Sequence, residues 1–197
     1  MIHPHTEVKF INEKVGYGVV ATQFIPAGTI TWVLDKLDRE FTPADVEKMD
    51  AVHQEILDTY TFRNDKGNFI LCWDDGKFVN HSFKSNCLTT AYDFEIAIRD
   101  IQVGEELTDD YGYLNISEPF EGVDEGTDRK VVYPDDLLNY HDVWDQQISK
   151  VFGKIIEHKQ PLKPFITEAL WSKVQRIIEG KEELDSILKN YYDPTKG

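Results

Sequence analysis

Residues 78–113 read FVNHSFKSNCLTTAYDFEIAIRDIQVGEELTDDYGY, and this stretch decides the fold. It opens with Asn80-His81-Ser82, which is followed four residues later by Asn86-Cys87. It ends with an acidic run, GEELTDD, that leads directly into Tyr111 and Gly112. The apolar residues of the central EIAI segment predict a β-strand between the two motifs.

A glycine motif, Gly16-Tyr17-Gly18, lies upstream and leads into the β-type run VVAT. A turn of sequence Ile25-Pro26-Ala27-Gly28 follows it, with proline and glycine at positions typical of turns. Because glycine has no Cβ, such a segment allows a ligand to approach the backbone closely. Taken alone, the two glycines of this motif are more often only turn residues.

The three motifs, in this order, resemble those of the SET-domain protein lysine methyltransferases over residues 7–113. The resemblance implies a mainly β SET-domain core, a β-clip with a pseudoknot, that carries an inserted helix. It also implies S-adenosyl-L-methionine as the cofactor. The implied reaction is transfer of its methyl group to the side-chain amine of a lysine in a protein substrate.

Site residues follow from the resemblance by position. Tyr111 is the implied catalytic residue, whose hydroxyl orients the amine and the methyl group, and His81 is not a general base. The implied cofactor-binding residues are Gly16, Tyr17, Gly18, Asn80, His81 and Tyr111. The candidates for the substrate channel are Tyr92, Asp109, Tyr113 and Tyr133. The amine must be neutral to react, and its ordinary pKa of ~10.4 is lowered by desolvation beside a positive sulfonium.

Two departures from the family pattern bear on activity. Asp109 stands two residues before the implied catalytic tyrosine, where family members often carry Phe or Tyr, so the number of methyl groups added does not carry over. Many SET proteins also continue into a cysteine-rich post-SET zinc cluster, whereas residues 120–130 contain no cysteine. We therefore expect no metal site, since zinc needs clustered Cys or His ligands. These departures leave an alternative open: a SET-like protein-interaction module with weak or no catalysis.

Composition restricts the partners. The chain has 36 acidic and 21 basic residues, a formal net charge of −15, which repels a phosphate backbone. We therefore expect no direct nucleic-acid binding and favour a basic protein or peptide that carries the lysine, although plain solubility also explains an acidic surface. No apolar run has the length of a membrane span, no signal peptide is visible, and two cysteines do not make a disulfide framework. These features predict a cytoplasmic protein that does not enter a membrane.

The expected organisation is a SET domain over 1–116, a loop over 117–134 and a helical region over 135–193. Within the first part, Thr42-Pro43 begins a predicted helix that extends to about Asp58. The helical region is predicted to contain one helix from Asp135 to about His158. A second helical segment follows Pro164, and Gly180 is expected to break or weaken it.

Overall fold

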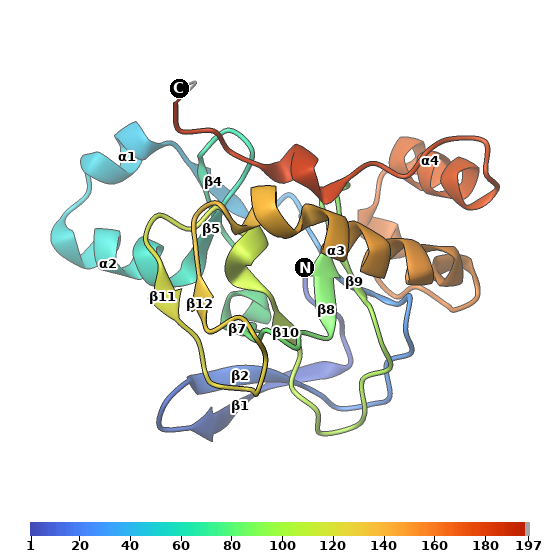
Figure 1. Ribbon diagram of the computed structural model, residues 1–197, viewed down its shortest axis with the longest axis horizontal. Helices are drawn as coiled ribbons and strands as arrows, with labels where there is room; N and C mark the ends of the chain where they lie inside the picture. The colour runs from blue at the N-terminus through green and yellow to red at the C-terminus, as the bar shows by residue number, and fades with distance from the viewer. Residues whose placement is uncertain (196–197) are drawn as a thin grey trace.

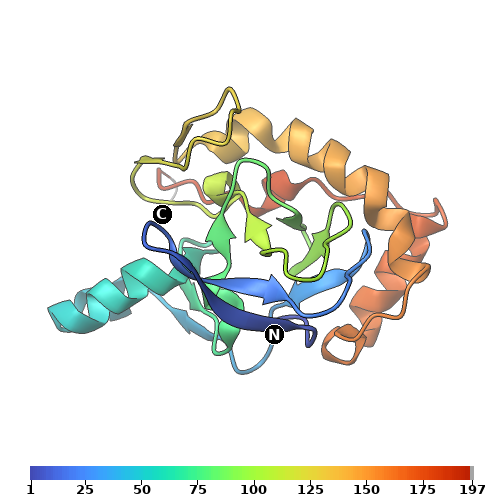
Figure 2. The same cartoon turned by 90° about the horizontal axis from the view of Figure 1, so that it is seen from below.

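The computed structural model describes residues 1–195 and consists of short strands and helices in three parts (Figure 1). An N-terminal hairpin lies on one side, the C-terminal helices cover the opposite side, and the remaining short strands lie between them. Seen from below, α2 projects away from the body of the molecule (Figure 2). The centre of the fold therefore consists of small strand pairs and not of one large sheet.

The strands are β1 (Thr6–Asn12), β2 (Gly16–Ala21), β3 (Ile30–Val33), β4 (Arg39–Phe41), β5 (Thr61–Arg63), β6 (Phe69–Leu71), β7 (Asn80–His81), β8 (Cys87–Thr89), β9 (Phe94–Ala97), β10 (Thr108–Asp109), β11 (Phe120–Glu121) and β12 (Val131–Val132). The α-helices are α1 (Pro43–Glu47), α2 (Ala51–Tyr60), α3 (Asp136–Phe152) and α4 (Glu168–Ile178). The 3₁₀ turns are η1 (Asp75–Phe78), η2 (Tyr111–Tyr113), η3 (Gly153–Ile156), η4 (Lys163–Phe165) and η5 (Ile187–Asn190).

The strands form five small sheets. The pairs β1–β2 and β11–β12 are antiparallel hairpins, and the two three-stranded sheets have the orders β3-β9-β8 and β4-β6-β5, also antiparallel. The pair β7–β10 is parallel. Because parallel neighbours need a long crossover connection, this short pair joins two segments that lie far apart along the chain.

The helix predicted over residues 42–58 is interrupted in the structure. Thr42 caps α1 as expected, and Pro43 occupies its first turn. The chain then leaves the helix, and the Asp50 carboxylate accepts a hydrogen bond from His53 N to begin α2. A short side-chain acceptor that offers the backbone a capped start competes with continuous helix, which explains the break.

The C-terminal helices share one hydrophobic core with the strands. Trp144 and Ile148 of α3 and Val174 of α4 pack in the same cluster as Ile30 and Phe94 of β3 and β9. α3 ends at Phe152, before the predicted His158, and continues as a 3₁₀ turn. α4 ends at Ile178, just before Gly180, whose φ of +70° is the left-handed conformation that glycine favours.

Residues 117–134, predicted to be a loop, contain the β11–β12 hairpin. Val132 is buried, and the Phe120 ring packs edge-on against His81. The ring contact places the hairpin beside the Asn80-His81 segment.

Candidate active site

The parallel β7–β10 pair brings the two C-terminal motifs into contact. Asn80 lies opposite Thr108, and His81 lies opposite Asp109. Asn86 strengthens this junction, because its side-chain Nδ2 donates to Glu106 O (2.7 Å) and its Oδ1 accepts from Thr108 N (2.9 Å). The local order of the site thus depends on asparagine side chains that satisfy backbone groups of the opposite motif.

The glycine motif reaches the same place through Asn80. Asn80 Nδ2 donates to the carbonyl oxygen of Tyr17 (2.9 Å) and to Glu106 Oε1 (2.7 Å). A Cβ on Gly18 would lie 2.2 Å from Glu106 Oε1 and 2.9 Å from Asn80 Nδ2. Only glycine permits this approach, while Gly16, with φ of +74°, forms the turn before it. The expected cofactor-binding residues Gly16, Tyr17, Gly18 and Asn80 are therefore neighbours.

His81 faces the other side of this junction. Its Nδ1 accepts a hydrogen bond from Tyr111 N (3.2 Å), and its ring packs edge-on against Phe83 with centroids 4.5 Å apart. Burial among aromatic rings lowers the pKa of His81. Its Nε2 is buried and has no hydrogen-bond partner within residues 1–195. The ring is thus a neutral structural element that fixes the backbone of Tyr111.

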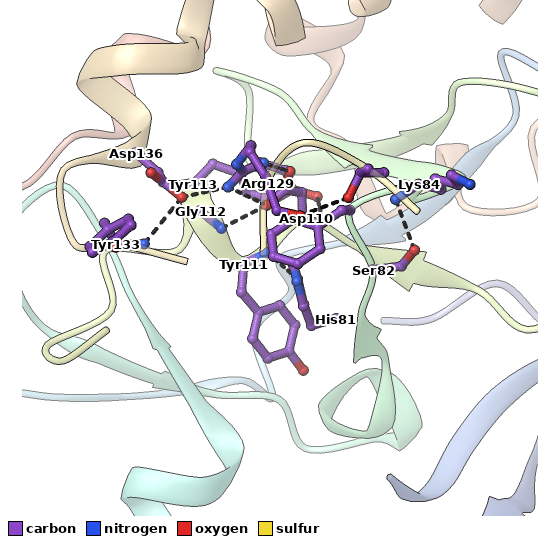
Figure 3. A network of polar contacts seen from close by, with 12 residues as sticks. His81, Ser82, Lys84, Asp110, Tyr111, Gly112, Tyr113, Arg129, Tyr133 and Asp136 are labelled. Atoms are coloured by element: carbon purple, nitrogen blue, oxygen red, sulfur yellow. Dashed lines mark hydrogen bonds and ion pairs between the residues drawn. The ribbon is translucent and has the colours of Figure 1, made fainter. Parts of the chain in front are cut away.

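Tyr111 connects this junction to a cavity. Its backbone is held by His81, and its ring points away from the Asp110 and Arg129 groups (Figure 3). Its hydroxyl donates to Val79 O at 2.6 Å. Burial raises the pKa of Tyr111 well above its usual range, so the hydroxyl stays protonated at physiological pH. Its oxygen lone pairs remain available to accept a hydrogen bond.

The cavity beside Tyr111 has a volume of about 470 Å³, within the range of small-molecule sites. It lies between the β4-β6-β5 sheet and the β7–β10 junction. Its aromatic lining consists of Trp32, Tyr60, Phe62, Phe69, Tyr111 and Phe120. Such walls suit an alkyl chain that carries a cation at its end.

Two carboxyl groups line the same cavity, Asp109 of β10 and Glu95 of β9. Burial raises the pKa of Asp109 to about 6, against the opposing effects of the Tyr113 hydroxyl and the Glu95 carboxyl. Burial, followed by the charge of Asp109, raises the pKa of Glu95 well above its ordinary range. Ionisation of Asp109 thus makes ionisation of Glu95 more costly, as expected for adjacent carboxyls. Glu95 was not among the residues singled out from sequence, although an acid inside the apolar FEIA strand is an available signal.

The other three residues considered for the substrate channel do not line this cavity. Tyr92 lies in the core beside Phe94, and its hydroxyl accepts from Asp185 N (2.7 Å). Tyr113 is 1% exposed, and its hydroxyl accepts from Asp110 N (3.2 Å). Tyr133 is 48% exposed and precedes α3. Of the four residues, only Asp109 reaches the cavity.

An arginine holds the 117–134 segment against the motifs (Figure 3). Arg129 forms ion pairs with the buried Asp110, next to Tyr111, and with the buried Asp136 at the start of α3. Its guanidinium lies over the Tyr140 ring, 4.5 Å from the centroid. This clamp joins η2, the β11–β12 hairpin and α3, and so closes the site from the C-terminal side. Within residues 1–195 no group of His, Cys, Asp and Glu side chains could hold a metal ion.

The geometry agrees with a comparison against known families. No curated protein matches the chain. The family model described as SET domain matches residues 16–112, a range that begins at the first glycine of the glycine motif and ends one residue after Tyr111. The three motifs that meet around Asn80 all fall in that range, and this protein is a SET-domain protein.

Proposed function

We propose that this protein is an S-adenosyl-L-methionine-dependent protein lysine methyltransferase. SET domains are methyltransferase domains in general, and the finer assignment depends on the position of Tyr111. The backbone of Tyr111 is bonded to His81 of the β7–β10 pair, and Tyr111 also lines the aromatic cavity. A transfer reaction needs this arrangement, in which donor and acceptor approach one hydroxyl from two sides.

The residues at the junction fit the proposed cofactor. Gly18 leaves the backbone bare beside Asn80 and Glu106, and an acidic Glu106 suits the ammonium of an amino acid moiety. Asn80, Glu106 and the backbone around Gly18 would hold the group, which supplies an activated methyl on a positively charged sulfur.

The residues of this chain desolvate and orient the lysine amine. The aromatic walls of the cavity exclude water from the lysine stem, and desolvation lowers the pKa of its amine. The Tyr111 hydroxyl donates its hydrogen bond to Val79 O, so its oxygen is free to accept an N–H of the amine and to aim the nitrogen lone pair. Orientation of this kind supplies a large share of the rate in a two-substrate reaction.

The direct test is Tyr111→Phe, which removes the hydroxyl and keeps the ring. With labelled cofactor and a lysine-bearing basic protein mixture, we expect kcat to fall about 10- to 1000-fold, with little change in cofactor Kd by calorimetry. Tyr133→Phe is the matched control, because Tyr133 is exposed and does not line the cavity. Equal methylation by the Tyr111 variant and the parent would contradict the assignment.

A second candidate, a SET-like interaction module without catalysis, stays open because an acid stands at Asp109, where family members often have an aromatic residue. Calorimetry separates the two functions, since a module need not bind S-adenosyl-L-methionine at micromolar Kd, about −8 kcal/mol. Under either function the acidic surface favours a basic protein or peptide partner. No helix within residues 1–195 is long and apolar enough to cross a membrane, and a cytoplasmic location stays a prediction from the sequence.

A further inference from the structure

Two buried polar atoms in the cavity wall have no hydrogen-bond partner. Asp109 Oδ1 and Trp32 Nε1 belong to side chains that are 4% and 5% exposed, and neither atom has a partner within residues 1–195. Both residues line the cavity. Unsatisfied buried polar atoms are rare in folded proteins because each costs stability. An acceptor and a donor without partners in one cavity wall therefore point to a polar ligand that forms hydrogen bonds with them.

The charges around the carboxyl pair make that ligand a cation. The titratable groups that act on Asp109 and Glu95 are Tyr111, Tyr113, Asp110, the Cys72 and Cys87 thiols and the N-terminal amino group. Of these only the amino group of Met1 is cationic, and it forms an ion pair with Asp35.

The two basic side chains in the cavity wall are already engaged. The Arg63 guanidinium lies 4.6 Å above the Phe69 ring, and Lys77 Nζ donates to Asp74 O at 2.6 Å. Within residues 1–195 neither Arg63 nor Lys77 forms an ion pair with Asp109 or Glu95, so a cation that enters the cavity from outside can contact the carboxyl pair.

We propose that the Asp109–Glu95 pair is the amine-binding and proton-accepting site for the substrate lysine. In this arrangement the Asp109 carboxylate accepts an N–H of the incoming ammonium, and Glu95 holds Asp109 in place. The binding step stands on the cavity alone, whereas the proton-transfer step rests on the proposed methyl transfer.

The proton and electron balance is simple. The lysine ammonium transfers one proton to the Asp109 carboxylate and becomes a neutral amine. The nitrogen lone pair then forms the N–C bond with the methyl of the sulfonium donor, and the pair of the broken C–S bond stays on sulfur. The product is a methylated ammonium, and Asp109 returns its proton to solvent. One proton is released for each methyl group transferred.

Burial of the pair makes this transfer easier. An ordinary Asp lies about 6.5 pKa units below a free lysine amine, and a pKa of about 6 for Asp109 narrows that gap. Desolvation in the aromatic cavity lowers the pKa of the amine and narrows it further. A base with a pKa close to physiological pH is also the most efficient for general base catalysis.

The binding test uses n-butylammonium as a lysine mimic and n-butanol as its uncharged control, by calorimetry at pH 8. We expect the parent to prefer the ammonium, and Asp109→Asn to weaken ammonium binding at least tenfold. Asp128→Asn, which removes an exposed carboxylate, should bind as the parent does. Equal binding of the alcohol and the ammonium, or unchanged ammonium binding in the Asp109 variant, would overturn the proposal.

A measurement on the parent alone covers the case in which the variant does not fold. Carboxyl ¹³C NMR follows the titration of Asp109, and n-butylammonium should lower its apparent pKa, because an adjacent cation stabilises the carboxylate. An unchanged titration at saturating amine would refute the contact.

The pH dependence of methylation separates this inference from the proposed function. Without Asp109 as base, the variant depends on amine that is already neutral, so its kcat/KM should rise about tenfold per pH unit from pH 7 toward the lysine pKa of ~10.4. The ratio of the parent kcat/KM to that of Asp109→Asn should therefore fall as pH rises. A ratio that does not change with pH would show that Asp109 has only a structural role. Absence of methylation by the parent, combined with Asp109-dependent ammonium binding, would refute the methyltransferase function and keep the cation site.

Discussion

Asp109→Asn should stabilise this protein in neutral and basic solution while it damages the site. The carboxyl group has a pKa of about 6 in the folded protein, raised by burial from 3.8. The folded state therefore binds this proton more tightly than the unfolded chain does. For an acid with a raised pKa, stability falls as pH rises from the unfolded pKa through the folded one. The free-energy loss is complete above about pH 6.

The magnitude follows from the shift. A difference of 2.2 pKa units (6 − 3.8) corresponds to about 3 kcal/mol. The loss is small near pH 4, so the advantage of the Asn variant should grow by about 2 kcal/mol between pH 4 and pH 8. Glu95 also increases the stability advantage of the Asn variant at high pH, because removal of the Asp109 charge makes ionisation of Glu95 less costly.

The assay is urea unfolding of parent and variant across that pH range. The absolute difference includes the contacts that Asn does not reproduce with Tyr113 and Glu95, so the pH slope of the difference is diagnostic. Asp128→Asn controls for the smaller net charge and should give a flat difference from the parent. An Asp109→Asn difference that stays flat or falls with pH would refute the raised pKa and the buried pair.

Two further substitutions test how the site is built. Gly18→Ala places a Cβ 2.2 Å from Glu106 Oε1. We expect the free energy of unfolding to fall by about 1–3 kcal/mol, the usual cost of overpacking, and cofactor binding to weaken in calorimetry. Parent-like values for both would show that the close approach is not required. Arg129→Met leaves two buried carboxylates without their cation and should cost about 3–5 kcal/mol in chemical unfolding. Its control, Lys130→Met, removes an exposed cation and should change stability little, and equal losses in both variants would argue against the clamp.

The junction of the motifs was open to prediction from sequence because it depends on residue types that act locally. Gly18 and Asn80 have few structural substitutes, since the first must lack a Cβ and the second must both donate and accept hydrogen bonds. The amphipathic period of α3 likewise follows from its own residues. The resemblance to the SET family then implied which segments meet, and the β7–β10 pair joins them.

The cavity was not predictable in the same way. Glu95 belongs to β9 and Asp109 to β10, and nothing local to either strand states that their side chains share a cavity. The same holds for Arg129, whose two carboxylate partners lie 19 and 7 residues away. Tyr92 and Tyr113 are candidates for the channel from sequence, yet both side chains are buried in the core. Side-chain direction across packed elements is a tertiary property, and local pattern carries little of it.

The buried carboxyl pair also bears on the choice between enzyme and inactive module. An aromatic residue at 109 would fill the space beside Tyr111 without placing a charge in the cavity wall, so the acid costs stability that an aromatic residue would not. Proteins retain such destabilising groups mainly at sites where function requires them. A module that only binds partners through its surface gains nothing from two carboxyls and an unpaired indole N–H inside a cavity. A site that must take up an ammonium and remove its proton needs these groups, and for that reason the departure at Asp109 supports catalysis instead of weakening the case for it.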